Sequence, residues 1–158
     1  MKQSFSIPLP TVSINKFYYN DKRHGIRTEA RDWQHKFFHF LSLGDNATKL
    51  EALRSTFDSK VHGYVVDFTF FVPKQVFVNK AGTLSSKAID LTNCEKSIID
   101  VLFLPKHFDV ESPYGCRNLN VDDKYLVEMR SRKKVSAYDY AYMDVVIELV
   151  DLSERCGL

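Results

Sequence analysis

The sequence predicts a single α+β domain in which a mixed β-sheet carries helices on one face. Segments with strand-like and helix-like apolar spacing follow one another in the order β, α, α, β, α, β, β. The chain has 158 residues, of which 44% are hydrophobic and 13% are aromatic, and this is enough material for one core. We therefore expect one domain over residues 1–158.

Residues 1–57 are expected to contain one strand and two helices. Residues 4–9 alternate polar and apolar side chains, which predicts a strand that stops at Pro10. Apolar residues at helical spacing then predict a helix from Thr28 to about Gly44 and a second helical segment over residues 46–57. The polar stretch between the strand and the first helix predicts an irregular connection.

Three further strands are expected after the second helical segment. Residues 64–72 are dense in β-branched and aromatic side chains, which predicts a largely buried strand, and a loop follows over residues 74–88. Near the end of the chain, residues 125–134 and 140–150 alternate in the manner of strands. We expect these two strands to form a hairpin whose turn lies at residues 136–137.

A third helix is expected between the second and third strands. Thr92 is followed three residues later by Glu95, a spacing that predicts a capping box, so the helix should begin at about Asn93. Pro105 closes the apolar pattern and predicts the end of the helix. Residues 106–120 contain several turn signals and predict a long loop.

Charge and cysteine content restrict the cellular setting. The 22 Lys and Arg residues nearly balance the 20 Asp and Glu residues, so any affinity for nucleic acid depends on where the cations lie. Cys94, Cys116 and Cys156 are widely spaced and match no zinc-ligand interval, which favours a reducing compartment. No apolar run approaches the length of a bilayer span. We expect a cytoplasmic protein without a membrane partner.

Acidic residues at the ends of predicted elements are the first candidates for chemistry. Asp90 precedes the third helix, and Asp122 and Asp123 precede a strand. Carboxylates gathered from separate elements suit divalent-metal phosphodiester chemistry, because Mg²⁺ prefers hard oxygen ligands. Aspartate is also common at helix caps and turns, and these residues alone leave that second interpretation open.

Polar and basic residues share faces on two predicted elements. Asn93, Lys96 and Asp100 lie on one face of the third helix, where Lys96 and Asp100 also have the spacing of an exposed ion pair. Alternate positions of a strand place Arg130, Arg132 and Lys134 on one face, which suits either phosphate contact or a solvated surface. A second basic cluster, beside two tyrosines, contains Lys22, Arg23 and Arg27.

Several of these segments resemble the RusA family of Holliday junction resolvases. DLTNCEKSIIDVL at residues 90–102 is similar to the family pattern D-x-D-N-x-x-K-x-x-x-D-x-L, and VDDK at 121–124 is similar to its later Asp-Asp pair. The opening SIPLPTVSINKFYY also resembles the family, with Ser13 and Asn15 followed by a Tyr-Tyr pair. Residues 46–60 and 109–118 are additions to the family pattern.

The resemblance implies a RusA-like fold and a homodimeric, Mg²⁺-dependent endodeoxyribonuclease, with Mn²⁺ as a substitute ion. Such an enzyme resolves four-way DNA junctions by paired symmetric nicks in recombination, repair or phage DNA processing. Proteins of this family are often encoded by phages or prophages, which would place the protein in the cytoplasm of a bacterial host. Four-way junctions or other branched DNA would be its partner.

The resemblance also assigns roles to residues. Asp90, Lys96 and Asp123 match catalytic positions, and Asp90, Asp122 and Asp123 match metal-binding positions. The residues expected to contact DNA are Asn15, Lys22, Arg23, Arg27, Asn93, Arg130, Arg132 and Lys134. Thr92 stands where the family has a second aspartate, and Ile89 stands where it often has a basic residue. A catalytically inactive protein that binds DNA junctions or a replication partner is therefore the second interpretation.

Overall fold

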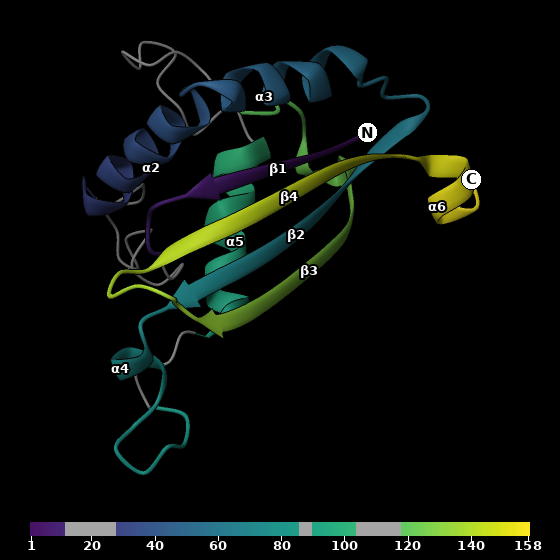
Figure 1. Cartoon of the computed structure of the whole chain (residues 1–158). Helices are drawn as coiled ribbons and strands as arrows, with labels where there is room; N and C mark the ends of the chain where they lie inside the picture. The colour runs from purple at the N-terminus through teal and green to yellow at the C-terminus, as the bar shows by residue number, and fades with distance from the viewer. Residues whose placement is uncertain (12–27, 86–89, 104–117) are drawn as a thin grey trace, which may run out of the picture.

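The fold is built on a four-stranded sheet (Figure 1). The computed structural model describes residues 1–11, 28–85, 90–103 and 118–158. The strands are β1 (Lys2–Ile7), β2 (His62–Val72), β3 (Leu126–Val135) and β4 (Tyr142–Asp151), in the order β1-β4-β2-β3. β4 runs antiparallel to β1 and β2, whereas β2 and β3 are parallel. The sheet is therefore mixed, as the sequence predicts.

Three longer helices pack against one face of this sheet. They are α2 (Thr28–Leu41), α3 (Asp45–Thr56) and α5 (Leu91–Phe103), and their apolar residues join one core with the strands. Two short helices, α4 (Lys74–Phe77) and α6 (Leu152–Cys156), follow β2 and β4 (Figure 1). The α+β class with helices on one face is confirmed. None of the helices in the described ranges is long and apolar enough to cross a membrane.

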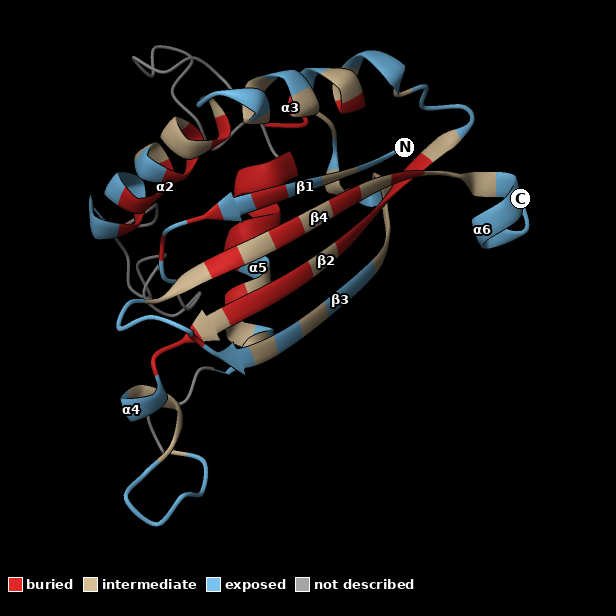
Figure 2. Cartoon of the chain, in the orientation of Figure 1, coloured by how far each residue is buried: buried red, intermediate tan, exposed pale blue. Residues whose placement is uncertain are grey.

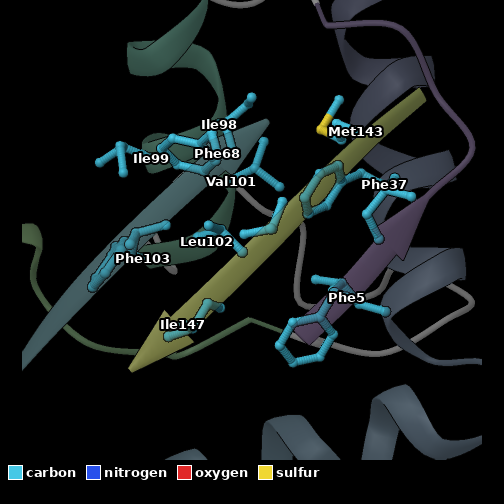
Figure 3. Packing of buried hydrophobic residues seen from close by; sticks show 14 of the residues in the cluster. Phe5, Phe37, Phe68, Ile98, Ile99, Val101, Leu102, Phe103, Met143 and Ile147 are labelled. Carbon is cyan, nitrogen blue, oxygen red and sulfur yellow. The ribbon is translucent and has the colours of Figure 1, made fainter. Parts of the chain in front are cut away.

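The core forms because the strands alternate in burial. In β4, Met143, Val145 and Ile147 are buried, and the residues between them are only partly so. Figure 3 shows Met143 and Ile147 of β4 on the same side of the sheet as Ile98 and Leu102 of α5, with aromatic rings among them. Figure 2 shows that β2 is buried along most of its length, as expected of a central strand covered by helices.

The predicted hairpin is wrong, because β3 and β4 are not neighbours. β2 lies between them, and the connection from β3 instead donates a hydrogen bond from the Ser136 amide to the Val72 carbonyl at the end of β2 (2.8 Å). β3 has many charged, exposed side chains and suits the edge of the sheet, whereas β4 is apolar on alternate residues and lies inside it. The chain segment containing α5 joins β2 to its parallel neighbour.

Two short helices were not expected. The structure places α4 within the segment predicted as a loop over residues 74–88, and an isolated bridge pairs Val78 with Leu84. α6 begins after Asp151, whose side chain accepts hydrogen bonds from the amides of Ser153 and Glu154. The Ser153 hydroxyl also donates to this carboxylate (2.6 Å), and that bond is the main reason why the pKa of Asp151 lies below its usual range, with the amide bonds adding to it.

Candidate functional site

The start of α5 is fixed by Asp90. One carboxylate oxygen of Asp90 accepts hydrogen bonds from the Thr92 amide (3.2 Å) and the Thr92 hydroxyl (2.8 Å), and the other accepts from the Asn93 side chain (3.1 Å). The carboxylate satisfies an amide that has no partner within the helix. Asp90 is exposed and serves as the N-cap, the structural role that the sequence left open.

The predicted capping box is therefore wrong. The helix begins at Leu91, two residues earlier than expected, and its cap is Asp90 and not Thr92. Glu95 does not return to the helix start, because its carboxylate accepts a hydrogen bond from the Ser131 hydroxyl on β3. The ionised Asp90 is the stronger acceptor for the first amides, and Glu95 ties α5 to the edge strand.

The side chains of three motif residues meet beside the middle of α5. The Lys96 ammonium contacts the carboxylate of Asp100 and lies 3.7 Å from the Asp123 carboxylate. Lys96 and Asp100 share a helix face, and Asp123 comes from the short 3₁₀ helix Asp123–Tyr125 before β3. We call Lys96, Asp100 and Asp123 the Lys96 cluster. It holds one cation between two anions and so has an excess of negative charge.

Asp100 is not part of an exposed pair. Its side chain is 3% exposed, whereas that of Lys96 is 49% exposed. A buried carboxylate is costly unless a cation or hydrogen-bond donors compensate it, and Lys96 is such a cation. The helix thus directs Asp100 inward, and Lys96 reaches from solvent to cover it. The Lys96 cluster therefore has a structural role in addition to any chemical one.

The predicted metal ligands are not assembled into one group. Asp122 caps the 3₁₀ helix by accepting a hydrogen bond from the Lys124 amide (2.9 Å), and Asp90 caps α5. In the described ranges, no three His, Cys, Asp or Glu side chains lie where they could hold a metal ion together. Of the three predicted ligands, only Asp123 belongs to the Lys96 cluster.

The predicted ligands have the right atoms for Mg²⁺, but their positions do not bring these atoms together. Carboxylate oxygens are the ligands this ion prefers, and Asp123 accepts no cap hydrogen bond that would occupy it. Asp90, however, already has three hydrogen-bond donors. Among the described residues, these carboxylates are therefore not assembled around a shared Mg²⁺.

The predicted basic face of β3 exists, and its cations differ in their partners. Arg130 pairs with Glu128, which also pairs with Arg155 and whose pKa is lowered chiefly by the hydrogen bond from Arg130. Arg132 forms a bidentate pair with Asp67 (2.7 and 2.9 Å). Lys134 has no acidic partner among the residues that the structure describes. Of the three predicted phosphate contacts, only Lys134 presents an uncompensated charge.

The remaining predicted DNA contacts are divided between two places. Asn93 lies on the first turn of α5 and donates to Asp90, so its amide supports the helix cap. Four others lie outside the described residues, namely Asn15, Lys22, Arg23 and Arg27.

Sequence reasoning missed an aromatic cluster at the end of the sheet. The rings of Tyr138 and Tyr140 are parallel with centroids 5.0 Å apart, and Tyr142 stacks on Phe71 at 4.3 Å. The signal was the spacing of the tyrosines, because alternate residues of an extended chain point to the same side. That segment was interpreted only as a turn and the start of a strand.

Comparisons with known proteins add no family assignment. No protein-family model matches the sequence, and no curated protein sequence matches it either. The resemblance to RusA therefore depends on the motif residues themselves and on where the fold places them.

Proposed function

We propose that the protein acts on branched DNA as a RusA-like endodeoxyribonuclease in the cytoplasm of a bacterial host, and that the Lys96 cluster marks the site of phosphodiester hydrolysis. Four-way junctions are the proposed substrate, Mg²⁺ or Mn²⁺ the cofactor, and paired symmetric nicks the expected products.

One observation supports this proposal more than any other. Lys96 and Asp123, which come from separate segments of the chain, were both expected at the reaction centre, and their charged groups lie 3.7 Å apart. A residue pair that the motif alone selects would not be expected to meet in an unrelated fold. The half-exposed ammonium is also accessible to a phosphate.

The chain's own residues suggest a division of roles. The Lys96 ammonium would stabilise negative charge on the scissile phosphate as the phosphodiester bond breaks. Asp100 keeps that ammonium in position from the buried side. Asp123 lies on the exposed side of the ammonium, where its carboxylate is within reach of the attacking water.

A cleavage assay with synthetic four-way junctions tests the proposal. Wild type, Asp123→Asn and Asp45→Asn would be incubated with the junction and Mg²⁺ or Mn²⁺. Asp45 is the matched control, since it is an exposed aspartate in the first turn of α3 and does not belong to the Lys96 cluster. We expect paired nicks from wild type and Asp45→Asn, and a loss of about 100-fold or more in Asp123→Asn. Equal cleavage by all three proteins would contradict the assigned site.

A second function is favoured by a specific observation. Thr92 replaces an expected carboxylate and donates two hydrogen bonds to Asp90, which leaves the ligand set incomplete. These features suit a protein that binds DNA junctions without cutting them. Junction binding by wild type with no nicks under either ion would support this function. Cleavage by Thr92→Asp would then show that only the ligand at this position is missing, whereas no cleavage would show that the rest of the site is missing too.

We also propose a homodimer as the active form. Two symmetric nicks across a four-way junction need two sites related by a two-fold axis, which a closed dimer supplies. Sedimentation of the protein alone and on the junction tests this. A strictly monomeric species in both cases would contradict paired cleavage.

A further inference from the structure

The sheet has an open face, opposite the one that α2, α3 and α5 cover. The register places side chains on it in rows across the strands. One row, at the end of the sheet where β4 begins, consists of Lys134, Phe71 and Tyr142. The next row contains Arg132, Thr69 and Asp144. An aromatic pair thus lies beside one unpaired lysine, with a row of polar side chains behind it.

Two more rings extend this row beyond the sheet. The connection from β3 to β4 contains Tyr138 and Tyr140, whose centroids lie 5.8 and 6.1 Å from that of Tyr142. Tyr138 is 57% exposed and Tyr140 is 50% exposed, and Figure 2 shows their connection as an exposed loop. We call Tyr138, Tyr140 and Tyr142 the tyrosine platform.

The loop that carries the platform is held in shape. Ser136 is buried, and its hydroxyl donates to the Tyr140 carbonyl (2.8 Å) and accepts from the Tyr138 amide (3.0 Å). Its own amide is bonded to the end of β2. The loop therefore holds the exposed rings in one arrangement, so that less conformational entropy of the loop is lost when a ligand binds.

The charges around the platform are mixed, because Lys134 is a cation whereas Asp139 and Asp144 are acidic neighbours, so a phosphate is favoured only on the Lys134 side. Lys134 is exposed on the same face as Phe71 and has no acidic partner in the described part of the chain. Asp67 is already neutralised by Arg132. The apolar surface is confined to the rings, because the adjoining row is polar and charged, and the core of a protein interface would instead be depleted of charge.

We propose that the tyrosine platform binds unpaired nucleotides by stacking their bases on its ring faces, with Lys134 contacting the adjoining phosphate. Exposed aromatic rings on an open sheet, with a cation at their side, are the elements that single-stranded nucleic acid recognition uses. The inference deepens the proposed action on branched DNA, since branched DNA with flaps or gaps contains unpaired bases, and rests on it for the choice of DNA.

Fluorescence anisotropy with a labelled oligothymidine tests the platform directly. The assay contains a chelator, so it requires no metal and no cleavage, and its failure is distinct from failure of the Lys96 cluster. We compare wild type with Tyr138→Leu/Tyr140→Leu, which keeps apolar side chains but removes the aromatic faces. We expect binding to weaken about tenfold or more in this double variant. An oligouridine of the same length shows whether the site distinguishes DNA from RNA, and tighter binding of oligouridine would contradict the choice of DNA.

Two controls make the result specific. Tyr138→Phe/Tyr140→Phe retains the rings and should bind as wild type does. Leu84→Ala removes an exposed apolar side chain from another loop and should also have no effect. Absence of oligothymidine binding by wild type, or equal binding by the Leu variant, would overturn the proposal. Self-association that the Leu variant abolishes, with DNA binding unchanged, would overturn it too and assign the patch to a protein interface.

Discussion

The two faces of the sheet have different chemistry although they alternate along the same strands. On the covered face, β2 contributes Tyr64, Val66, Phe68 and Phe70, all of which belong to the core. On the open face, the residues between them lie among the ion pairs of β3 and the aromatic row. Burial of the apolar face stabilises the fold, whereas the other face carries ion pairs and aromatic rings.

The contrast shows which face tolerates change. Interior side chains are close-packed, so a missing group leaves a cavity. On the open face, Asp67 and Phe71 are only partly buried, so water can fill the space of a lost group there, whereas Val65 and Thr69 of the same strand are buried. Substitutions of adjacent residues in one strand should therefore have very different effects, and the following predictions test this from the largest effect to the smallest.

The largest difference is expected between Phe68→Ala and Phe71→Ala. Phe68 is fully buried, and its removal should cost about 3–5 kcal/mol of unfolding free energy. Phe71 is only partly buried and stacks on Tyr142, so its loss should cost less than half as much. Urea denaturation measures both values. Equal losses would mean that a partner or another segment covers the open face.

Tyr64 provides a second test of the covered face, through pH. Burial raises the pKa of Tyr64 to about 12, with a small opposing effect from Arg54. The folded state therefore holds its proton more firmly than the unfolded state, whose pKa is near 10. The associated stability is present below pH 10 and is lost as the pH rises to 12, by about 3 kcal/mol for a two-unit shift.

The variant Tyr64→Phe separates this effect from other alkaline titrations. It should remove that part of the decline in unfolding free energy between pH 10 and 12, and spectroscopic titration should lose its latest-ionising tyrosine. On the open face, burial raises the pKa of Tyr142 as well, with a further contribution from Asp144. A wild-type decline identical to that of Tyr64→Phe would contradict the assignment.

The alternation of apolar residues was sufficient to predict most of the fold. It identified three of the four strands and the three longer helices, because periodicity reports which face of an element is buried, whereas β2 was identified by its β-branched and aromatic content. The partner of β3 could not be predicted in this way. Strands adjacent in sequence usually pair, which favoured a pairing of β3 with β4. The structure instead places the apolar β2 beside β4 and the charged β3 at the edge of the sheet.

The candidate site was harder to predict than the fold. The motif selected Lys96 and Asp123, which the structure brings together, but it could not show that Asp100 is buried, because that depends on how α5 is rotated against the sheet. Nor could it show that Asp90 caps the helix, since Thr92 offers an equally suitable cap by sequence. The pairing of Arg132 with Asp67 depends on strand register, which was not known.

Lys96→Met should destabilise the protein because it removes the ammonium that contacts the buried Asp100 carboxylate. We expect a loss of about 2 kcal/mol at pH 7, less than for a fully buried pair because Lys96 is half exposed. The double variant Lys96→Met/Asp100→Asn should recover much of this loss, since it buries no charge. Equal stability of the double and the single variant, measured by urea denaturation, would show that Asp100 is not what Lys96 stabilises.

Asp90 permits a smaller test that separates its structural role from a catalytic one. Asp90→Ala removes the N-cap of α5 and should cost about 1 kcal/mol. Asp90→Asn keeps a capping side chain and should retain nearly all of the stability. If Asp90 also takes part in cleavage, Asp90→Asn should be folded and inactive on a four-way junction. Thermal denaturation and the cleavage assay together distinguish the two roles, and a large loss of stability in Asp90→Asn would contradict the cap.

The smallest effect is expected for the ion pair between Arg132 and Asp67 on the open face. The pair is bidentate, but the Arg132 side chain is 46% exposed, and water and salt screen such pairs. A double-mutant cycle with Asp67→Asn and Arg132→Gln should give a coupling energy of about 0.5 kcal/mol that falls as salt is added. Breaking the pair should matter more for binding than for folding, because Asp67→Asn releases a guanidinium beside the row that contains Lys134. We therefore expect Asp67→Asn to bind oligothymidine more tightly than wild type at low salt, and unchanged or weaker binding would show that Arg132 does not face the nucleic acid.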